Sequence, residues 1–153
     1  MKILSIDTAS NLCTVAVLEN KKCIKEIIVN DARNHSEKIM PVIEQALSES
    51  KLTLQDINLI VCDKGPGSFT GIRIGVGTVL AFKDSLNIPC VGISSLESLA
   101  YNIDSDGIIC SLIDAKNNNV YFGVFEKKNN IVTQLEELSF KTIKEIIPIL
   151  TKY

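Results

Sequence analysis

Histidine is scarce in this sequence, and no cysteines stand in a metal-binding pair. His35 is the only histidine, so a metal site built on two or more histidines is excluded. No C-x-x-C motif occurs, and an odd number of cysteines cannot all pair within one chain. The cysteines are Cys13, Cys23, Cys62, Cys90 and Cys110. We expect them to be reduced and buried, as in a cytoplasmic protein.

Long apolar runs and an excess of one charge are also missing. No run approaches the roughly 18 apolar residues of a membrane-spanning helix, and Asp7 interrupts the first apolar stretch too early for a signal peptide. Sixteen basic and 18 acidic residues give a net charge of −2, so the composition predicts no basic face that binds nucleic acid directly. With 46% hydrophobic residues, the chain is of the globular class.

The first two thirds of the chain alternate between strand and helix patterns. Apolar alternation and polar turns predict a three-stranded antiparallel meander, followed by helices and buried strands in turn. The predicted elements are strands 2–6, 13–19 and 22–29, helix 35–49, strand 57–62, helix 71–86, strand 88–93 and helix 94–101. Pro41 must lie near the first turn of its helix or kink it. Ser94 or Ser95 is the expected cap of the last helix.

The remaining third repeats the strand pattern. The polar run Asp104-Ser105-Asp106-Gly107 predicts a boundary between a lobe of residues 1–104 and a second, incomplete lobe of residues 105–153. In the second lobe we predict strands 108–114, 119–126 and 131–138 and a helix over 140–153. This order predicts an α/β protein with a ribonuclease-H-like lobe, in which helices flank a mixed sheet, and the start of a second similar lobe.

A glycine-rich loop, Gly65-Pro66-Gly67-Ser68-Phe69-Thr70-Gly71, joins a predicted strand to a predicted helix. Such loops often hold phosphate, because the helix N-terminus presents unpaired N–H groups. The glycine spacing does not match the dinucleotide fingerprint, and no Gly-Lys-Ser/Thr follows as a P-loop requires. Phosphate contact through Gly65, Gly67, Ser68 and Thr70, with Thr70 as the N-cap, remains one reading. The other is that the glycines supply special backbone angles and close packing.

Two titratable residues are candidates for chemistry. Asp7 ends the first strand, where a carboxylate can bind a magnesium ion or orient water for phosphoryl transfer. The alternative, which we favour, is that Asp7 opens a turn through its own side chain. His35 precedes the long helix, and we expect it to help start that helix rather than serve in a Ser-His-Asp triad.

Helix 71–86 is almost free of charge between Ile74 and Phe82, so we expect it to be buried on two sides. One face, with Ile72, Val76 and Val79, should cover the sheet. The opposite face carries Gly71 and Gly75 and would admit a second helix, either 35–49 or one from another subunit. The predicted partner interface consists of Met40, Ile43, Leu47, Gly71, Ile74, Gly75, Thr78 and Phe82.

Five stretches resemble the bacterial TsaB (YeaZ) family of tRNA threonylcarbamoyladenosine biosynthesis: "MKILSIDTAS", "HSEKIMPVIEQAL", "GPGSFTGIRIG", "GISSLESLA" and "IDAKNNNVYFGVF". They cover nearly the whole chain, and the loop motif is highly specific. The resemblance implies the fold of the actin, sugar-kinase and Hsp70 superfamily, with two ribonuclease-H-like lobes. Asp63 stands where the family usually has a glycine. The chain ends at Tyr153, before relatives complete their second lobe, and this second departure puts a nucleotide cleft between two complete lobes in doubt.

The resemblance implies a non-catalytic subunit without a cofactor of its own. Its partner is a TsaD-type catalytic subunit that modifies adenosine 37 of tRNA; a TsaE-type ATPase joins them, and tRNA is met only through the complex. ATP or ADP with magnesium then belongs to the complex, and a homodimer is a further expectation.

Two rival hypotheses remain. One is an ATP-dependent phosphotransferase or ATPase of the same superfamily, with Asp7 at the metal and the loop near phosphate. The other, weaker one is a hydrolase; an older family label, glycoprotease, finds no residues in this sequence that support it.

Overall fold

The computed structural model describes residues 1–30 and 34–153, which divide into two compact units, Met1–Ile93 and Ser94–Tyr153. The first unit contains β1 (Lys2–Asp7), β2 (Leu12–Glu19), β3 (Lys22–Asn30), α1 (His35–Glu49), a 3-10 turn (Leu54–Asp56), β4 (Leu59–Asp63), α2 (Phe69–Leu86) and β5 (Cys90–Ile93). The second contains α3 (Ser95–Tyr101), β6 (Gly107–Asp114), β7 (Asn119–Lys128), β8 (Ile131–Gln134), β9 (Ser139–Thr142) and α4 (Ile143–Leu150).

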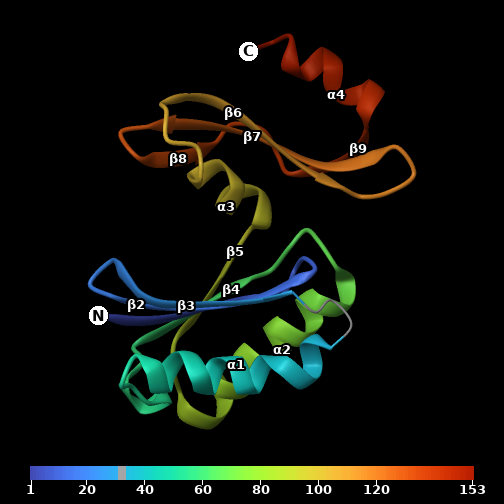
Figure 1. The fold of residues 1–153 in the computed structure, drawn as a ribbon. Helices are drawn as coiled ribbons and strands as arrows, with labels where there is room; N and C mark the ends of the chain where they lie inside the picture. The colour runs from blue at the N-terminus through green and yellow to red at the C-terminus, as the bar shows by residue number, and fades with distance from the viewer. Residues whose placement is uncertain (31–33) are drawn as a thin grey trace. The chain divides into compact units, whose positions relative to one another are not determined.

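A five-stranded mixed sheet organises the first unit, in the order β3-β2-β1-β4-β5 (Figure 1). β1, β2 and β3 form the predicted antiparallel meander, and β4 and β5 run parallel to β1. Parallel neighbours need crossover connections, which α1 and α2 provide. The predicted ribonuclease-H-like arrangement is therefore confirmed.

The core of the first unit lies between the sheet and the two helices, which cover the same face (Figure 1). Strand alternation produces this arrangement, because every second side chain of β1 and β2 points toward the helices. Leu4, Ile6, Val15 and Val17 are fully buried there against Ile43 of α1. Pro41 lies inside α1, beyond its first turn, and is exposed.

The second unit is an antiparallel sheet with one helix on each face. β7 pairs with β6 along its length, with β9 through residues 119–122 and with β8 through residues 125–128. Leu96 and Phe125 belong to the core beneath α3, and Phe122 and Ile146 to the core beneath α4. Figure 1 shows the two helices on opposite sides of this sheet.

Several predicted features differ from the structure. Residues 139–142 are a strand, and α4 begins at Ile143, where the Thr142 amide and hydroxyl both donate to the Glu145 carboxylate. β5 is not buried on both faces: Val91 is 49% exposed, because β5 is an edge strand. The compact units divide after Ile93 rather than after Asp104, since α3 packs on β6, β7 and β8.

Candidate functional site

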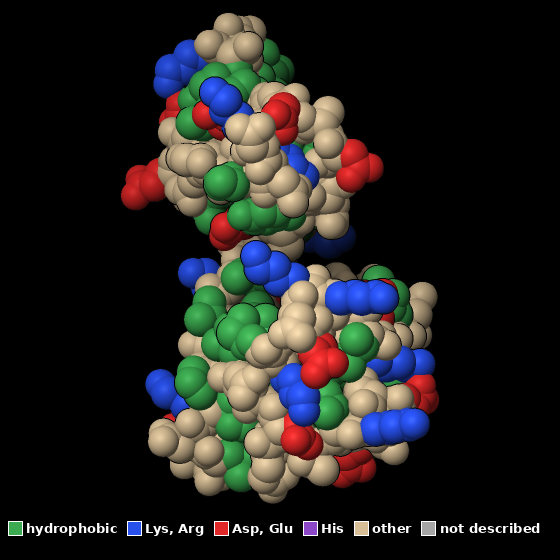
Figure 2. Space-filling model, turned by 90° about the vertical axis from the view of Figure 1, so that its left-hand side faces the viewer, with side chains coloured by type: hydrophobic (Ala, Val, Ile, Leu, Met, Phe, Trp, Pro, Cys, Tyr) green, Lys and Arg blue, Asp and Glu red, His purple; other side chains and the backbone are tan. Residues whose placement is uncertain are grey.

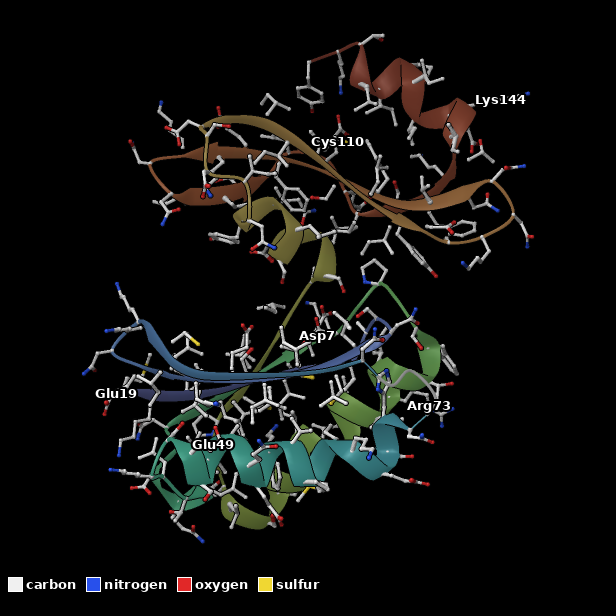
Figure 3. All side chains as sticks on the ribbon, viewed as in Figure 1. Asp7, Glu19, Glu49, Arg73, Cys110 and Lys144 are labelled. Atoms are coloured by element: carbon white, nitrogen blue, oxygen red, sulfur yellow. The ribbon has the colours of Figure 1, made fainter. Side chains whose placement is uncertain are left out.

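Two carboxylates lie side by side at the carboxyl ends of neighbouring parallel strands. Asp7 ends β1 and Asp63 ends β4, and the register pairs Ile6 with Cys62 just before them. Ile6 and Cys62 face the helices, so both carboxylates are on the opposite face of the sheet, where Figure 3 shows Asp7.

Each carboxylate closes a local turn. Asp7 Oδ1 accepts from the Ala9 amide at 2.8 Å, and Asp63 Oδ1 accepts from the Gly65 amide at 2.6 Å. The turn role predicted for Asp7 is thus present, and Asp63 repeats it one strand away. Burial raises the pKa of the Asp7 carboxyl above its usual 3.8; the Ala9 amide opposes this shift, and the Asp63 charge adds to it.

His35 begins α1 and is buried. Its Nε2 lies 3.0 Å from the Ser10 carbonyl oxygen, so Nε2 carries the proton and donates, and Nδ1 has no hydrogen-bond partner among residues 1–30 and 34–153. A triad histidine needs one nitrogen on a serine hydroxyl and the other on a carboxylate. His35 has neither contact in the described residues and instead ties the start of α1 to the β1–β2 turn.

The glycines of the 65–71 loop allow close approach of main chains. Gly65 has φ +89°, in the left-handed region, and follows the turn at Asp63. Cβ atoms at Gly67 and Gly71 would collide with the backbone carbonyls of Ala9 and Thr8 respectively. The Ser68 amide donates to Ala9 O at 2.6 Å, and the Thr8 hydroxyl donates to Gly71 O at 2.7 Å. These contacts support the structural reading of the loop.

Phosphate binding by this loop stays a prediction, and the hydrogen bonds count against it. Ser68, not the predicted Thr70, caps α2: its hydroxyl accepts from the Gly71 amide at 3.2 Å. The amides of Gly65, Ser68 and Gly71 are therefore already bonded within the chain. Asp7 and Asp63 beside the loop would also repel an anion.

Asp7 and Asp63 are the side chains at the strand ends of the first unit that could hold a magnesium ion. Within residues 1–30 and 34–153, no three His, Cys, Asp or Glu side chains gather closely enough to hold a metal. Asp7 and Asp63 each already accept from an amide with one carboxylate oxygen. Magnesium in proteins is usually held by one or two carboxylates, with water completing its octahedral shell, so a magnesium ion at Asp7 stays a prediction.

The predicted partner residues do not share one outward surface. Ile43, Leu47 and Phe82 are buried in the core, and Gly71 packs against the Thr8 backbone. Met40 is 40% exposed, whereas Ile74 and Thr78 are partly buried. The predicted orientation of Gly75 is wrong: a Cβ there would lie 2.5 Å from the Thr8 hydroxyl and 3.6 Å from Cys62 Sγ, so Gly75 faces the sheet.

The side of α2 that faces away from the sheet carries Phe69, Arg73, Gly77 and Leu80, which we call the outer α2 surface. Phe69 is 74% exposed and Leu80 46%. The Arg73 guanidinium, in solvent (Figure 3), lies 5.2 Å from the Phe69 ring centroid. A Cβ at Gly77 would meet nothing within 4 Å.

Sequence reasoning missed this surface because the predicted helix began at residue 71, after Phe69. The buried positions of α2 are Gly71, Gly75, Val79 and Phe82, a stripe at four- and three-residue spacing. Because two of these four positions are glycine, the stripe does not stand out as apolar in the sequence. The four- and three-residue spacing of the stripe was the signal that could have identified the buried face.

Charge does not single out a nucleic-acid surface. Figure 2 shows lysine and arginine side chains interspersed with aspartate and glutamate on the face it draws. Lys2 pairs with Asp56 at 3.6 Å, and Lys25 pairs with Glu49. Among the described helices, none has both the length and the apolar composition needed to span a membrane.

Comparison with known proteins gives a family match. A family model described as "TsaD: tRNA N6-adenosine threonylcarbamoyltransferase" matches residues 22–151. The Bacillus subtilis protein named "tRNA threonylcarbamoyladenosine biosynthesis protein TsaB" is 40% identical over 136 residues, which is 88% of this chain and 59% of the relative. The chain spans less than two thirds of the length of such curated relatives.

Solved structures agree on the fold. YeaZ from Pseudomonas aeruginosa has a TM-score of 0.85 at 26% identity, covering 92% of this chain and 67% of that one. The ROK hexokinase of Thermus thermophilus has a TM-score of 0.53 at 15% identity, covering 89% of this chain and 50% of that one. The second likeness concerns the fold alone and places the chain with the sugar-kinase and actin-like folds.

Proposed function

The chain belongs to the TsaD family of tRNA threonylcarbamoyladenosine biosynthesis proteins, on its TsaB (YeaZ) branch, and we propose that it is a non-catalytic partner subunit of this modification machinery. The chain binds and activates a TsaD-type catalytic subunit in the cytoplasm. A TsaE-type ATPase joins this complex. The chain contacts tRNA only as part of the complex. ATP or ADP with magnesium belongs to the complex, and a homodimer is the form without the partner.

The observation that carries the proposal is the outer α2 surface. Two large apolar side chains, Phe69 and Leu80, are exposed on an ordered helix. Gly77, which lies between them and has no side chain, lets another helix approach the α2 backbone closely. Met40 of α1 is a further exposed apolar side chain of this helical layer. Exposed apolar residues that gather on a rigid element are typical of a protein-binding surface.

The residues at the strand ends support a non-catalytic role. The Asp7 and Asp63 carboxylates and the His35 Nε2 hold local backbone geometry, and the amides of Gly65, Ser68 and Gly71 are engaged within the chain. A phosphotransferase would need a metal ligand set and free amides near the phosphate. The described residues of the first unit contain no group of three metal-ligating side chains, so we place the chemistry on the partner.

Size-exclusion chromatography tests the proposal. We expect the purified chain mixed with the TsaD-type subunit of the same organism to elute in an earlier peak that contains both proteins. With the TsaE-type ATPase, ATP with magnesium, a threonylcarbamoyl donor and tRNA added, the mixture should transfer threonylcarbamoyl to the tRNA, and the chain alone should neither transfer it nor hydrolyse ATP with magnesium. ATP hydrolysis by the chain alone, with no shared peak, would instead support the phosphotransferase hypothesis.

A further inference from the structure

β5 leaves one side of its backbone unpaired. It forms the edge of the five-stranded sheet, with β4 as its partner. Ile60 N donates to Pro89 O and Lys64 N donates to Ile93 O, both at 2.9 Å. Since the peptide groups of a strand alternate in direction, the N–H and C=O groups of Cys90 and Gly92 point away from β4. In the described residues, no other strand pairs with them.

An apolar pocket lies beside this free edge, beneath α2. Its volume is about 150 Å³, and it is partly open. The lining residues are Cys62, Lys64, Val76, Val79, Leu80, Cys90, Val91 and Gly92. A cavity of about this size with apolar walls can hold a benzene molecule, which is close in size to a leucine or phenylalanine side chain.

Cys90 and Gly92 line the pocket and also carry the free backbone groups of the edge, and both positions face the α2 side of the sheet. Register pairs Cys90 with Ile60 and Gly92 with Cys62, so these positions face α2, as Ile60 and Cys62 do. In a strand added beside β5, every second side chain would point to the same face. Backbone pairing at Cys90 and Gly92 would therefore bring a side chain to the pocket.

Lys64 supplies the charge of the site. Its aliphatic stem lies over Gly92, where a Cβ would be 3.2 Å from Lys64 Cδ. The Lys64 side chain is exposed and forms no ion pair with any described residue, and the pocket lining contains no acidic residue. A ligand that complements this site has an apolar group for the pocket and a negative charge next to it for Lys64.

We propose that β5 binds an extended peptide segment of a partner protein by strand addition, with one large apolar side chain in the pocket and an acidic side chain two residues away near Lys64. Main-chain hydrogen bonds provide affinity in such complexes, and pockets for alternate side chains provide specificity. The pocket shares Leu80 with the outer α2 surface, whereas the free backbone edge at Cys90 and Gly92 lies on β5 and not on that surface.

A second copy of the chain fits this edge less well. β5 has four residues, and pairing two copies through it would bring two unpaired Lys64 side chains to one edge. A free small molecule could fill the pocket but would leave the Cys90 and Gly92 backbone groups unpaired. A peptide satisfies the backbone edge, the pocket and the charge together.

The probe is the acetylated, amidated peptide Thr-Glu-Thr-Leu-Thr-Glu-Thr, which places leucine and both glutamates on one face of a strand. We expect saturable binding of a fluorescently labelled form to the full chain by anisotropy. A peptide with lysine for both glutamates should bind more weakly, and one with N-methylated backbone amides should not bind.

The reactivity of the chain's own cysteine thiols shows where the peptide binds. Cys90 lines the pocket and is partly exposed, whereas Cys23 is exposed on β3. Burial raises the pKa of Cys62 to about 12, which keeps that thiol slow to react. We expect the peptide to slow iodoacetamide labelling of Cys90 in proportion to the bound fraction, with Cys23 unchanged as the internal control.

Two variants distinguish the contribution of the pocket to peptide binding from that of the Lys64 charge. Gly92→Val adds a branched side chain at the pocket against the flexible Lys64 stem, and Gly92 does not have a left-handed backbone, so the strand should persist while peptide binding is lost. Lys64→Glu should weaken binding by up to about fivefold, the effect of a partly exposed ion pair. Circular dichroism melting checks that both variants stay folded.

Unchanged binding to folded Gly92→Val, or unchanged Cys90 labelling at saturating peptide, would overturn the proposal. Equal binding of the N-methylated peptide, or full displacement by 4-methylpentanoate, would instead assign the pocket to a small apolar acid. A dimer of the chain alone that protects Cys90 would assign the edge to a second copy.

Discussion

At the level of single residues, glycines set how α2 meets the rest of the first unit. Gly71 and Gly75 admit the Thr8 backbone and hydroxyl, whereas Gly77, two residues further along, faces open space. The sequence makes these glycines look equivalent. Their roles differ because the helix turns by about 100° per residue, so a shift of two residues moves a position to the opposite side.

Gly75→Leu should destabilise the first unit by about 1–3 kcal/mol or more, because its side chain would collide with the Thr8 hydroxyl and crowd Cys62. Gly77→Ala is the matched control, and it should be neutral or stabilise by up to about 1 kcal/mol through helix propensity. Urea denaturation followed by circular dichroism measures both. A Gly75→Leu chain as stable as the parent would show that the helix is not packed as described.

Asp7 should make the stability of the first unit depend on pH. Burial and the Asp63 charge raise its pKa in the folded state, so the folded state binds the proton more tightly than the unfolded state does. The stability due to this proton is fully present below the unfolded value of 3.8 and is lost as pH rises through the raised pKa. The ionised side chain is thus an unfavourable element at neutral pH.

Asp7→Asn should therefore gain stability relative to the parent as pH rises from about 4, since the amide oxygen can still accept from the Ala9 amide. Urea denaturation between pH 3 and pH 7 tests this, with exposed Asp104→Asn as the control. A constant difference between Asp7→Asn and the parent across this range would contradict the assignment.

At the level of elements, a buried lysine holds the end of α3 against β7. Lys127 is 4% exposed, and its ammonium donates to Tyr101 O at 2.9 Å and to Ile103 O. A cation at a helix C-terminus also interacts favourably with the helix dipole. Both carbonyls would lose this partner if the ammonium were removed.

Lys127→Met should lower the stability of the second unit by about 1–3 kcal/mol, because it leaves those carbonyls without their donor. Exposed Lys128→Met is the control on the same strand. Hydrogen exchange at α3 should become faster in the first variant only. Equal exchange in both variants would mean that Lys127 does not secure the helix.

Elements with strong periodicity could be predicted from sequence, and those set by their neighbours could not. The alternation of Leu4 and Ile6 and the helical spacing of Ile39 and Ile43 identify β1 and α1 directly. Val91 looks like a core residue, but its exposure depends on β5 lying at an edge. The start of α4 is marked in the sequence by the Thr142–Glu145 capping pattern, which the predicted helix 140–153 did not take into account.

Functional residues were harder to predict than elements. The turn role of Asp7 follows from its position before a polar stretch, and the turn is present. The proximity of Asp63 depends on β4 pairing with β1, which local sequence does not specify. The outer α2 surface depends on which stripe of an almost uncharged helix is buried, and that choice is made by tertiary packing.

For the whole molecule, two compact units are formed by one chain of a family whose curated members are longer. The first unit has its own sheet, helices and core, and the outer α2 surface belongs to it alone. A partner that binds this surface therefore requires only the first unit to be folded. The central claim is that the TsaD-type subunit we propose as partner binds the outer α2 surface.

The affinity of Gly77→Leu for the TsaD-type subunit is the most direct test of that claim. The added side chain meets no atom of the described chain within 4 Å of its Cβ, so the variant should melt like the parent. A large side chain in a close helix contact should weaken pairing by at least about tenfold. Isothermal titration calorimetry measures this, with Gln55→Leu as an exposed control outside α2. Parent-like affinity of folded Gly77→Leu would contradict the account and exclude the outer α2 surface as the partner site.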